Sequence, residues 1–214
     1  MKGMEVSVLL PAAGLGERLG QGPKAFLKVG GRTLLDWVLD TFSFADEILV
    51  ALPPGYRLPD RGRVRYLEGG KTRQESVARL LAEANTAMVL VHDVARPFAS
   101  RALALRVLEK ARATGAAVPV LPVPDTLVEA VGGEYGPVLP RERLRLVQTP
   151  QGFFTALLRE AHAYAKMKGI QATDDAQLVR ALGYPVALVE GEVRAFKITY
   201  PEDLALAQAL VWNA

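Results

Sequence analysis

Residues 6–24 read VSVLLPAAGLGERLGQGPK, a short apolar run followed by a loop of very small residues. The apolar run at 6–10 is partly β-branched and stops at Pro11, which predicts a buried β-strand. Four of the residues that follow carry almost no side chain: Ala12, Ala13, Gly14 and Gly16. Such a loop lets main-chain N–H groups approach an anion directly, and Arg18 and Lys24 add two cations. We therefore predict that this strand carries a polyphosphate-binding loop at its end.

The loop matches neither of the two common phosphate-binding patterns. The dinucleotide fingerprint requires glycine at the position of Leu19, and the Walker A pattern requires Gly-Lys-Ser or Gly-Lys-Thr, whereas Lys24 lies between Pro23 and Ala25. An ordinary strand-to-helix turn with surface cations is the alternative on the glycines alone. The full string, P-A-A-G-x-G-x-R followed by P-K, resembles the signature of nucleotidyltransferases that join a nucleoside monophosphate to a phosphorylated alcohol or sugar. That resemblance implies that the loop wraps a triphosphate.

Composition narrows the classes of function. The 214 residues suit a single domain (1–214), half of them are hydrophobic, and the net charge is only +3. No block of Lys and Arg resembles a nucleic-acid-binding tail, so we expect no nucleic-acid partner. The absence of cysteine excludes disulfides and thiolate chemistry, and two histidines, His92 and His162, exclude a histidine-rich metal site. The first apolar run is too short for a signal peptide or a membrane span, so we expect a cytoplasmic protein without a membrane partner.

Apolar strands alternate with amphipathic helices along most of the chain. We expect strands at 6–10, 47–52, 64–67, 88–91, 115–121, 146–148, 185–189 and 196–198. We expect helices at 34–42, 77–84 and 153–168, and others that begin after Ser100, after Thr173 and at Pro201. This alternation predicts an α/β fold, a Rossmann-like, mostly parallel twisted sheet with helices on both faces. Loops 11–24, 69–76 and 92–97 each follow a strand, so they should converge at one edge of the sheet.

Residues 122–144 depart from this pattern. They form short alternating pieces around Gly132 and Gly133 and contain too few apolar residues for a core of their own, which predicts a protruding β-hairpin, hereafter the arm. An isolated two-stranded hairpin is marginal in water, so we expect the arm to pack on a second subunit and form a homodimer. A floppy surface loop is the alternative, although structureless loops of this length are uncommon.

Five further strings follow the opening loop in a fixed order. They are GGxxRxxSV at 69–77, HDVARP at 92–97, QTPQ at 148–151, TDDA at 173–176 and KITYPEDL at 197–204. Together they resemble the 2-C-methyl-D-erythritol 4-phosphate cytidylyltransferase family of the non-mevalonate isoprenoid pathway. The similar ribitol-5-phosphate cytidylyltransferases share most of these strings. The resemblance implies that a phosphomonoester oxygen attacks the α-phosphorus of CTP and pyrophosphate leaves, with catalysis by positioning and charge neutralisation.

The resemblance also implies roles on the nucleotide side. The loop of Pro11, Ala12, Ala13, Gly14 and Gly16 would wrap the triphosphate, and Arg18 and Lys24 would supply its cations. Lys24 would also stabilise the charge that develops in the transition state. Gly70, Arg73 and Ser76 would hold the cytosine, and Asp93 would lie near the ribose and a Mg²⁺ ion that bridges phosphates. The alternatives are a solvated helix cation for Arg18, a helix cap for Ser76, and a structural carboxylate paired with Arg96 for Asp93. We interpret His92 as a packing residue and Arg96 as partly structural.

On the acceptor side, the resemblance implies that Arg141 and Lys197 bind the phosphorylated polyol. Asp125, Thr126 and Thr149 would bind its hydroxyls or its phosphate. If the arm is exchanged between subunits, Asp125, Thr126 and Arg141 complete the site of the neighbour. We expect Asp174 and Asp175 to cap a helix, and the alternative is that they support the site from behind the residues that contact the substrate.

Three functions remain open from the sequence. Val128 and Ala195 stand where the family often has Lys and Asn, so ribitol 5-phosphate or another sugar phosphate is an alternative acceptor. A non-catalytic nucleotide sensor is the alternative from another class, and the cations Arg18, Lys24 and Lys197 count against it. The absence of Cys and the scarcity of Asn also suggest a heat-stable protein.

Overall fold

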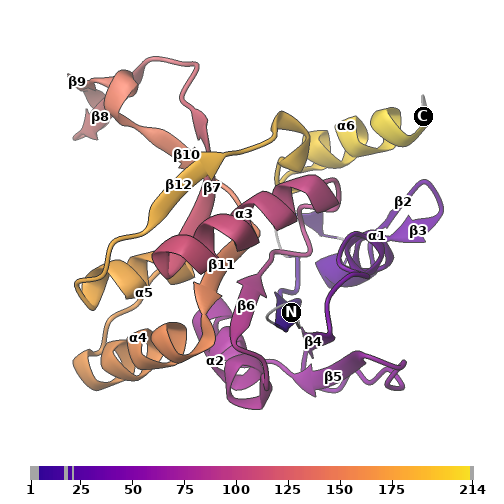
Figure 1. The fold of residues 1–214 in the computed structure, drawn as a ribbon. Helices are drawn as coiled ribbons and strands as arrows, with labels where there is room; N and C mark the ends of the chain where they lie inside the picture. The colour runs from indigo at the N-terminus through magenta and orange to yellow at the C-terminus, as the bar shows by residue number, and fades with distance from the viewer. Residues whose placement is uncertain (1–4, 17–18, 21, 213–214) are drawn as a thin grey trace.

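A central eight-stranded sheet organises the chain (Figure 1). The structure is a computed structural model that describes residues 5–16, 19–20 and 22–212. In chain order the strands of this sheet are β1 (Val6–Pro11), β4 (Glu47–Leu52), β5 (Val64–Glu68), β6 (Met88–Val91), β7 (Ala116–Pro122), β10 (Arg145–Val147), β11 (Gln151–Phe154) and β12 (Ala187–Glu190). Their spatial order is β10-β7-β11-β6-β1-β4-β5, and β12 pairs with β7.

Most neighbouring strands are parallel. β1 pairs in parallel with β4 and β6, β4 with β5, and β12 with β7, whereas β11 and β10 run antiparallel to their neighbours. The register places Val8 opposite Ile48 on one side and opposite Leu90 on the other. The predicted α/β fold with a mostly parallel sheet is therefore confirmed.

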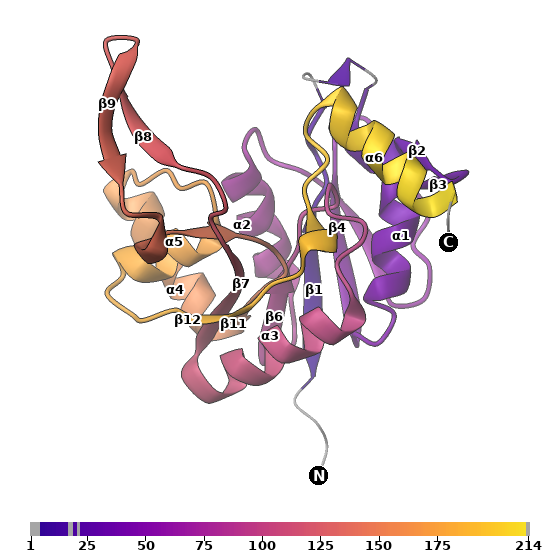
Figure 2. The same ribbon diagram turned by 90° about the horizontal axis from the view of Figure 1, so that it is seen from above.

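Helices cover both faces of the sheet (Figures 1 and 2). They are α1 (Leu34–Thr41), α2 (Arg73–Glu83), α3 (Arg101–Thr114), α4 (Thr155–Lys168), α5 (Asp175–Ala181) and α6 (Pro201–Trp212). Because side chains alternate along a strand, Val8 and Leu10 pack into a core with α1 and α3, while Leu9 packs into a second core with α2, α4 and α5. No helix in the described part of the chain is both long enough and apolar enough to span a membrane.

Polar caps set where several helices begin. Thr33 forms a capping box with Asp36 at α1, and Ser100 caps α3 through the backbone N–H of Leu103. Thr72 caps α2, so that helix begins at Arg73, four residues earlier than its apolar stripe predicts. At α5 the expected cap Thr173 is wrong: Asp174 is the N-cap and accepts from the backbone N–H of Gln177.

Two further predictions differ from the structure. Residues 151–154 form β11, which inserts antiparallel between β6 and β7, so α4 begins at Thr155 rather than at 153. Residues 196–198 do not form a strand: they follow the short 3₁₀ helix η4 (Val193–Ala195) as an extended connection, in which the Ile198 N–H bonds to the Ala95 carbonyl. The side chain of Lys197 and the carbonyl of Ile198 add contacts to Asp93 and Lys24, so loops rather than a strand hold this segment.

The arm is a β-hairpin that projects from the body (Figure 2). It consists of β8 (Leu127–Val131) and β9 (Glu134–Leu139), joined through Gly132 and Gly133, which both have positive φ. The 3₁₀ helix η3 (Arg141–Arg143) returns the chain to β10. A second small hairpin, β2 (Lys28–Val29) with β3 (Arg32–Thr33), lies beside α6.

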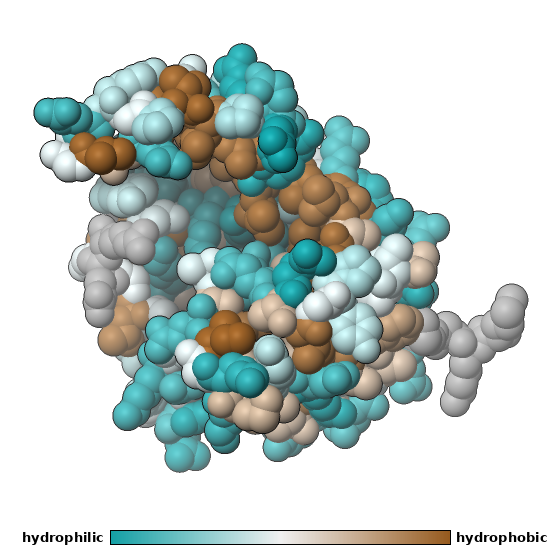
Figure 3. All heavy atoms as spheres, turned by 90° about the vertical axis from the view of Figure 1, so that its left-hand side faces the viewer, coloured by the Kyte–Doolittle hydropathy of each residue, from teal (hydrophilic) through white to brown (hydrophobic). Residues whose placement is uncertain are grey.

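Large hydrophobic side chains remain exposed on the arm and on the nearby edge strands. They are Val131, Tyr135 and Val138 on the arm, Leu146 and Val147 on β10, and Leu188 on β12. Figure 3 shows hydrophobic residues on the arm and next to its base, with a hollow below the arm. Contiguous apolar surface of this kind is typical of an interaction site.

Candidate active site

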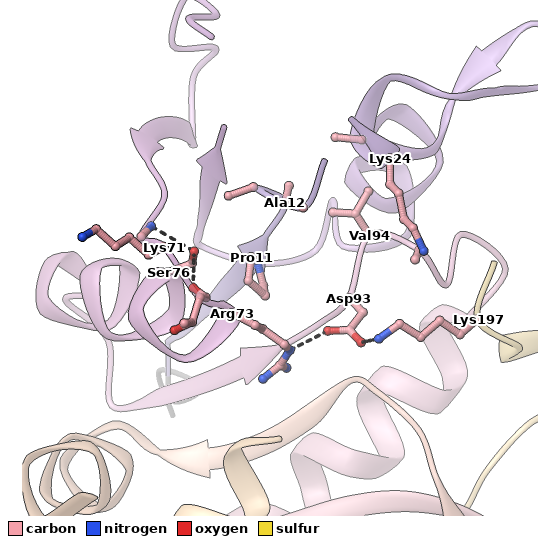
Figure 4. Close-up of a pocket in the computed structure, with 15 residues that line it drawn as sticks. Pro11, Ala12, Lys24, Lys71, Arg73, Ser76, Asp93, Val94 and Lys197 are labelled. Carbon is pink, nitrogen blue, oxygen red and sulfur yellow. Dashed lines mark hydrogen bonds and ion pairs between the residues drawn. The ribbon is translucent and has the colours of Figure 1, made fainter. Parts of the chain in front are cut away.

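Loops that follow β1, β5 and β6 meet at the carboxyl end of the sheet and line a cavity of about 260 Å³ (Figure 4). The structure brings ten of the predicted residues together around this cavity: Pro11, Ala12, Ala13, Gly14, Lys24, Gly70, Arg73, Ser76, Asp93 and Lys197. The expected convergence of the three loops is confirmed. Lys71 and Thr72 also line the cavity; neither was predicted, although both lie inside the string at 69–77.

The small-residue loop closes on itself at its two ends. The Lys24 N–H donates to the Gly14 carbonyl, with 3.3 Å between nitrogen and oxygen. Gly16 has φ of +69°, and a Cβ atom there would lie 2.4 Å from the Gly22 carbonyl oxygen, so only glycine fits. Gly16 therefore shapes the loop and does not itself line the cavity. Arg18 lies outside the described residues.

The second loop is locked onto the first turn of α2. The Ser76 hydroxyl donates to the Thr72 carbonyl at 2.9 Å and accepts from the Gly70 N–H at 3.0 Å. At Gly69 a Cβ would lie 2.3 Å from the Cβ of Ala13. The first and second loops can therefore approach each other this closely only because residue 69 has no side chain.

Asp93 lies between two cations at the floor of the cavity. Arg73 Nε donates to Asp93 Oδ1 at 2.9 Å, and Lys197 Nζ donates to Asp93 Oδ2 at 2.7 Å (Figure 4). Burial alone would raise the pKa of Asp93, but the charges of Arg73 and Lys197 outweigh burial and hold that pKa well below its usual range. Asp93 is therefore an anion held in place by cations from two distant segments.

Lys24 connects the first loop to the segment that carries Lys197. Its Nζ donates to the Ile198 carbonyl at 2.9 Å, 174 residues along the chain. Four cations line the cavity, Lys24, Lys71, Arg73 and Lys197, against the single carboxylate of Asp93. Among the described residues the cavity is thus rich in positive charge, which suits a polyanionic ligand.

His92 supports Asp93 from the interior. The ring is fully buried and packs on Phe42 with 4.9 Å between centroids, which confirms the expected packing role. The Arg96 carbonyl can only accept, so His92 Nε2 carries the proton at 3.2 Å, and Nδ1 accepts from the Thr149 hydroxyl at 3.0 Å. Burial lowers the pKa of His92 to about 4, which agrees with a neutral ring.

Thr149, predicted to bind substrate, is buried beneath the cavity rather than in its lining. Its Oγ1 accepts from the Asp93 N–H at 3.1 Å. The side chain of Arg96 donates to the Ala195 carbonyl at 2.7 Å and is structural, as expected. The alternative that pairs Arg96 with Asp93 is wrong, since the ion-pair partners of Asp93 are Arg73 and Lys197.

A second carboxylate, Asp175, holds Arg73 from behind. Its side chain is only 1% exposed, accepts from Arg73 Nη1 at 2.8 Å, and lies 2.9 Å from His162 Nε2. Burial alone would raise the pKa of Asp175, but the hydrogen bond from His162 and the charge of Arg73 lower it. The expectation that Asp175 caps a helix is therefore wrong, whereas Asp174 does cap α5. The partner Arg73 lies 102 residues away, and no local pattern signals such a contact.

The three predicted acceptor residues of the arm do not line this cavity. Asp125 and Thr126 lie at the base of the arm, outside the cavity lining, and Arg141 donates to the Pro124 carbonyl in a shallow depression there. Within one chain, the structure thus separates Asp125, Thr126 and Arg141 from Lys197.

The described residues contain no cluster of three His, Cys, Asp or Glu side chains suited to a metal ion. Asp93 is the one carboxylate that lines the cavity among them, and both of its oxygens contact cations. This donor set does not suit a metal held by protein alone. It fits a Mg²⁺ ion held chiefly by ligand phosphates and water, because Mg²⁺ commonly takes only one or two carboxylates.

Comparisons with known proteins agree with this geometry. The family model described as IspD, 2-C-methyl-D-erythritol 4-phosphate cytidylyltransferase, matches residues 6–213. A curated enzyme of that name from Thermus thermophilus is 70% identical over 213 residues, which are 99% of this chain and 100% of the relative. Its counterpart from Deinococcus radiodurans is 52% identical and covers 95% of this chain and 88% of its own length.

Solved structures give the same result. The crystal structure of 2-C-methyl-D-erythritol 4-phosphate cytidylyltransferase from Thermus thermophilus superposes with a TM-score of 0.90, at 68% identity, over 98% of this chain and 100% of that one. A 4-diphosphocytidyl-2C-methyl-D-erythritol synthase from Anaerococcus prevotii, 28% identical, has a TM-score of 0.85 over 98% and 96% of the two chains. The chain belongs to the 2-C-methyl-D-erythritol 4-phosphate cytidylyltransferase family.

Proposed function

We propose that this chain transfers CMP from CTP to 2-C-methyl-D-erythritol 4-phosphate and releases pyrophosphate. The observation that carries the proposal is the cavity in which Lys24, Arg73 and Lys197 surround the end of β1 and its small-residue loop. The product is 4-diphosphocytidyl-2-C-methyl-D-erythritol, an intermediate of non-mevalonate isoprenoid biosynthesis. Membership in the family supports the same reaction.

The reaction brings two anions together. A phosphate oxygen of the acceptor attacks the α-phosphorus of CTP, the bond from that phosphorus to the bridging α–β oxygen breaks, and pyrophosphate carries the electron pair away. No protein nucleophile is needed, so positioning and charge neutralisation supply the catalysis. Lys24 would neutralise the charge that develops on the α-phosphate, and Arg18 would bind the rest of the triphosphate. Main-chain N–H groups of the loop 11–16 would line the same phosphates.

The nucleoside would lie over the second loop. Gly70, Ser76 and Arg73 would hold the cytosine, and Asp93 would lie near the ribose. A purine would be excluded by the size of the base pocket and by base-edge hydrogen bonds that would stay unpaired.

A Mg²⁺ ion would neutralise phosphate charge when bound. Phosphate oxygens and water would supply most of its ligands, with Asp93 as its protein ligand.

The acceptor would be bound between two subunits. Lys197 from one chain and Asp125, Thr126 and Arg141 from the arm of a second copy would contact the polyol phosphate. The exposed hydrophobic side chains of the arm support such a homodimer, because a hairpin with this surface is marginal alone. Thr149 would act through Asp93, since its hydroxyl is buried.

Pyrophosphate release tests the proposal directly. The purified chain is incubated with Mg²⁺ and with CTP, UTP, ATP or GTP, each with 2-C-methyl-D-erythritol 4-phosphate, ribitol 5-phosphate or no acceptor. Release that requires CTP and 2-C-methyl-D-erythritol 4-phosphate is the expected result. A preference for ribitol 5-phosphate would reassign the acceptor, and the departures at Val128 and Ala195 make that comparison necessary. CTP binding without turnover on any acceptor would instead favour a nucleotide sensor.

A further inference from the structure

A chain of hydrogen-bonded polar groups leads from the interior to the cavity wall. His162 on α4 contacts Asp175 on α5, Asp175 contacts Arg73 on α2, and Arg73 contacts Asp93 after β6, at 2.9, 2.8 and 2.9 Å in turn. Neither His162 nor Asp175 lines the cavity. Whatever these two residues contribute to a ligand in the cavity must therefore pass through Arg73.

Contacts with two carboxylates fix the orientation of the Arg73 guanidinium. Its Nε is held by Asp93 and its Nη1 by Asp175, two carboxylates on different elements. A guanidinium is a rigid planar fork, so two anchors on two of its nitrogens fix both its position and its plane. The remaining nitrogen, Nη2, is buried and has no hydrogen-bond partner in the described part of the chain. A buried donor of this kind calls for a partner, and a bound ligand or its water would supply one.

Asp175 is not the sole tie between α2 and the region of α5. Gln74 already fastens α2 to the segment before α5: its Nε2 donates to the Ile170 carbonyl at 3.1 Å and its Oε1 accepts from the Ala172 N–H at 3.0 Å. Asp174, the neighbour of Asp175, caps α5. A buried ion pair adds little net stability, because desolvation of both charges offsets their attraction. A role in positioning explains the buried carboxylate better than a role in stability.

We propose that Asp175 is a positioning residue that aims Arg73 at the nucleotide, and that His162 fixes the orientation of the Asp175 carboxylate. The inference rests on the proposed use of Arg73 in CTP binding. Without the Asp175 charge, Arg73 keeps only Asp93, which it shares with Lys197, and its plane is no longer fixed. Nucleotide binding then weakens, while the acceptor side, which Arg73 does not contact, changes little.

The test is a double-mutant cycle on CTP affinity. Calorimetry without acceptor should give CTP binding about tenfold weaker in Asp175→Asn, a coupling within the range found for contacting residues. In the Arg73→Ala background the same substitution should change the affinity no further. Steady-state kinetics of Asp175→Asn should show a raised KM for CTP with a nearly unchanged KM for the acceptor. An equal loss of affinity in both backgrounds, or no loss in either, would overturn the proposal.

Asp174→Asn is the matched control. It alters the neighbouring acid and the start of α5 but does not remove a contact of Arg73. CTP affinity should therefore stay within about twofold of the parent even if the melting temperature falls, because residues without a shared partner contribute independently. If Asp175→Asn does not fold, His162→Gln takes its place. A severalfold loss of CTP affinity in His162→Gln supports the proposal, and an unchanged affinity overturns it.

The same data separate this inference from the proposed function. A parent protein that neither binds CTP nor releases pyrophosphate would overturn the function itself. A parent that does both, with an Asp175→Asn variant of equal CTP affinity, would overturn only the positioning role.

Discussion

At the scale of single residues, Lys24 lies where the first loop of the cavity meets the segment of Lys197. Its ammonium group donates to the Ile198 carbonyl, so it connects these two distant parts of the chain. Several of the residues that line the cavity with it are small, which leaves room for a ligand next to it. We expect the charge of Lys24 to act on the transition state more than on the ground state.

We expect Lys24→Ala to lower kcat by about 10²–10³-fold, the range for loss of one preorganised charge-stabilising donor. The fold should survive, since the side chain reaches a carbonyl beside the cavity and belongs to neither hydrophobic core. Pyrophosphate release and far-ultraviolet circular dichroism measure the two effects. Lys28→Ala, at an exposed lysine outside the cavity, is the control and should keep its activity. Near-normal turnover in Lys24→Ala would remove this residue from the mechanism.

Buried His92 makes stability depend on pH. Burial holds its pKa at about 4, against 6.5 for the unfolded chain. Between these values the unfolded state binds a proton that the folded state does not, so the free energy of unfolding falls as the pH falls. Asp93 and Asp175 have lowered pKa values, so their contribution to the free energy of unfolding is fully present above about pH 3.8 and is lost only at lower pH. Between pH 6.5 and about 4, the change in the free energy of unfolding is therefore due to His92.

Urea unfolding at several pH values between about 7 and 4 should reveal a progressive loss of the free energy of unfolding that integrates to about 3 kcal/mol by about pH 4. His92→Asn cannot take up this proton. We expect the variant to be less stable at neutral pH and to show a flatter decline. Parallel profiles for the parent and the variant would contradict the assignment to His92.

At the scale of elements, the arm receives little support from the rest of its own chain. Its two strands pair only with each other, and Val131, Tyr135 and Val138 face solvent. Its register is irregular between Val128 and Ala130, which adds local twist. These features favour packing on another copy of the chain.

Deletion of residues 129–136, which removes the tip of the arm, should shift sedimentation from dimer toward monomer. The eight-stranded sheet should remain, because β8 and β9 are not part of it. Activity should fall with dimerisation if Asp125, Thr126 and Arg141 serve the neighbouring subunit. A control that replaces the exposed Tyr56, which lies outside the arm, with serine should leave sedimentation unchanged. An unchanged sedimentation coefficient in the deletion would exclude the arm as a dimer contact.

At the scale of the whole molecule, composition and packing favour resistance to heat. Cysteine is absent and asparagine is rare, so two sources of thermal damage are scarce. Two hydrophobic cores, one on each face of the sheet, bury strands β1, β4 and β6 completely apart from their ends. Scanning calorimetry should give a midpoint above about 65 °C, the upper end of the mesophile range. A midpoint within that range would contradict the expectation.

The confirmed predictions of secondary structure depend on local sequence patterns, and the predictions that were wrong concern segments without such a pattern. Strands β1, β4 and β6 are apolar runs that end at Pro, Gly or polar residues, so periodicity and punctuation locate them without any partner. The arm was predictable for the same reason, through Gly132 and Gly133. By contrast, residues 151–154 and 196–198 carry no pattern that separates strand from helix or loop. Pairing with β6 and β7 makes a strand of the first segment, whereas the second contacts a loop and stays irregular.

Local sequence was enough to predict the α/β class, the small-residue loop after β1, the order of the motifs and most of the residues that line the cavity, because these depend on residues close together in the chain. Which groups each charge contacts could be learned only from the folded chain. Asp93 meets Lys197 across 104 residues, Arg73 meets Asp175 across 102, and Thr149 lies beneath the site rather than in it. The free energy of an ion pair depends on distance and burial in space, and neither quantity is contained in a string of residue types.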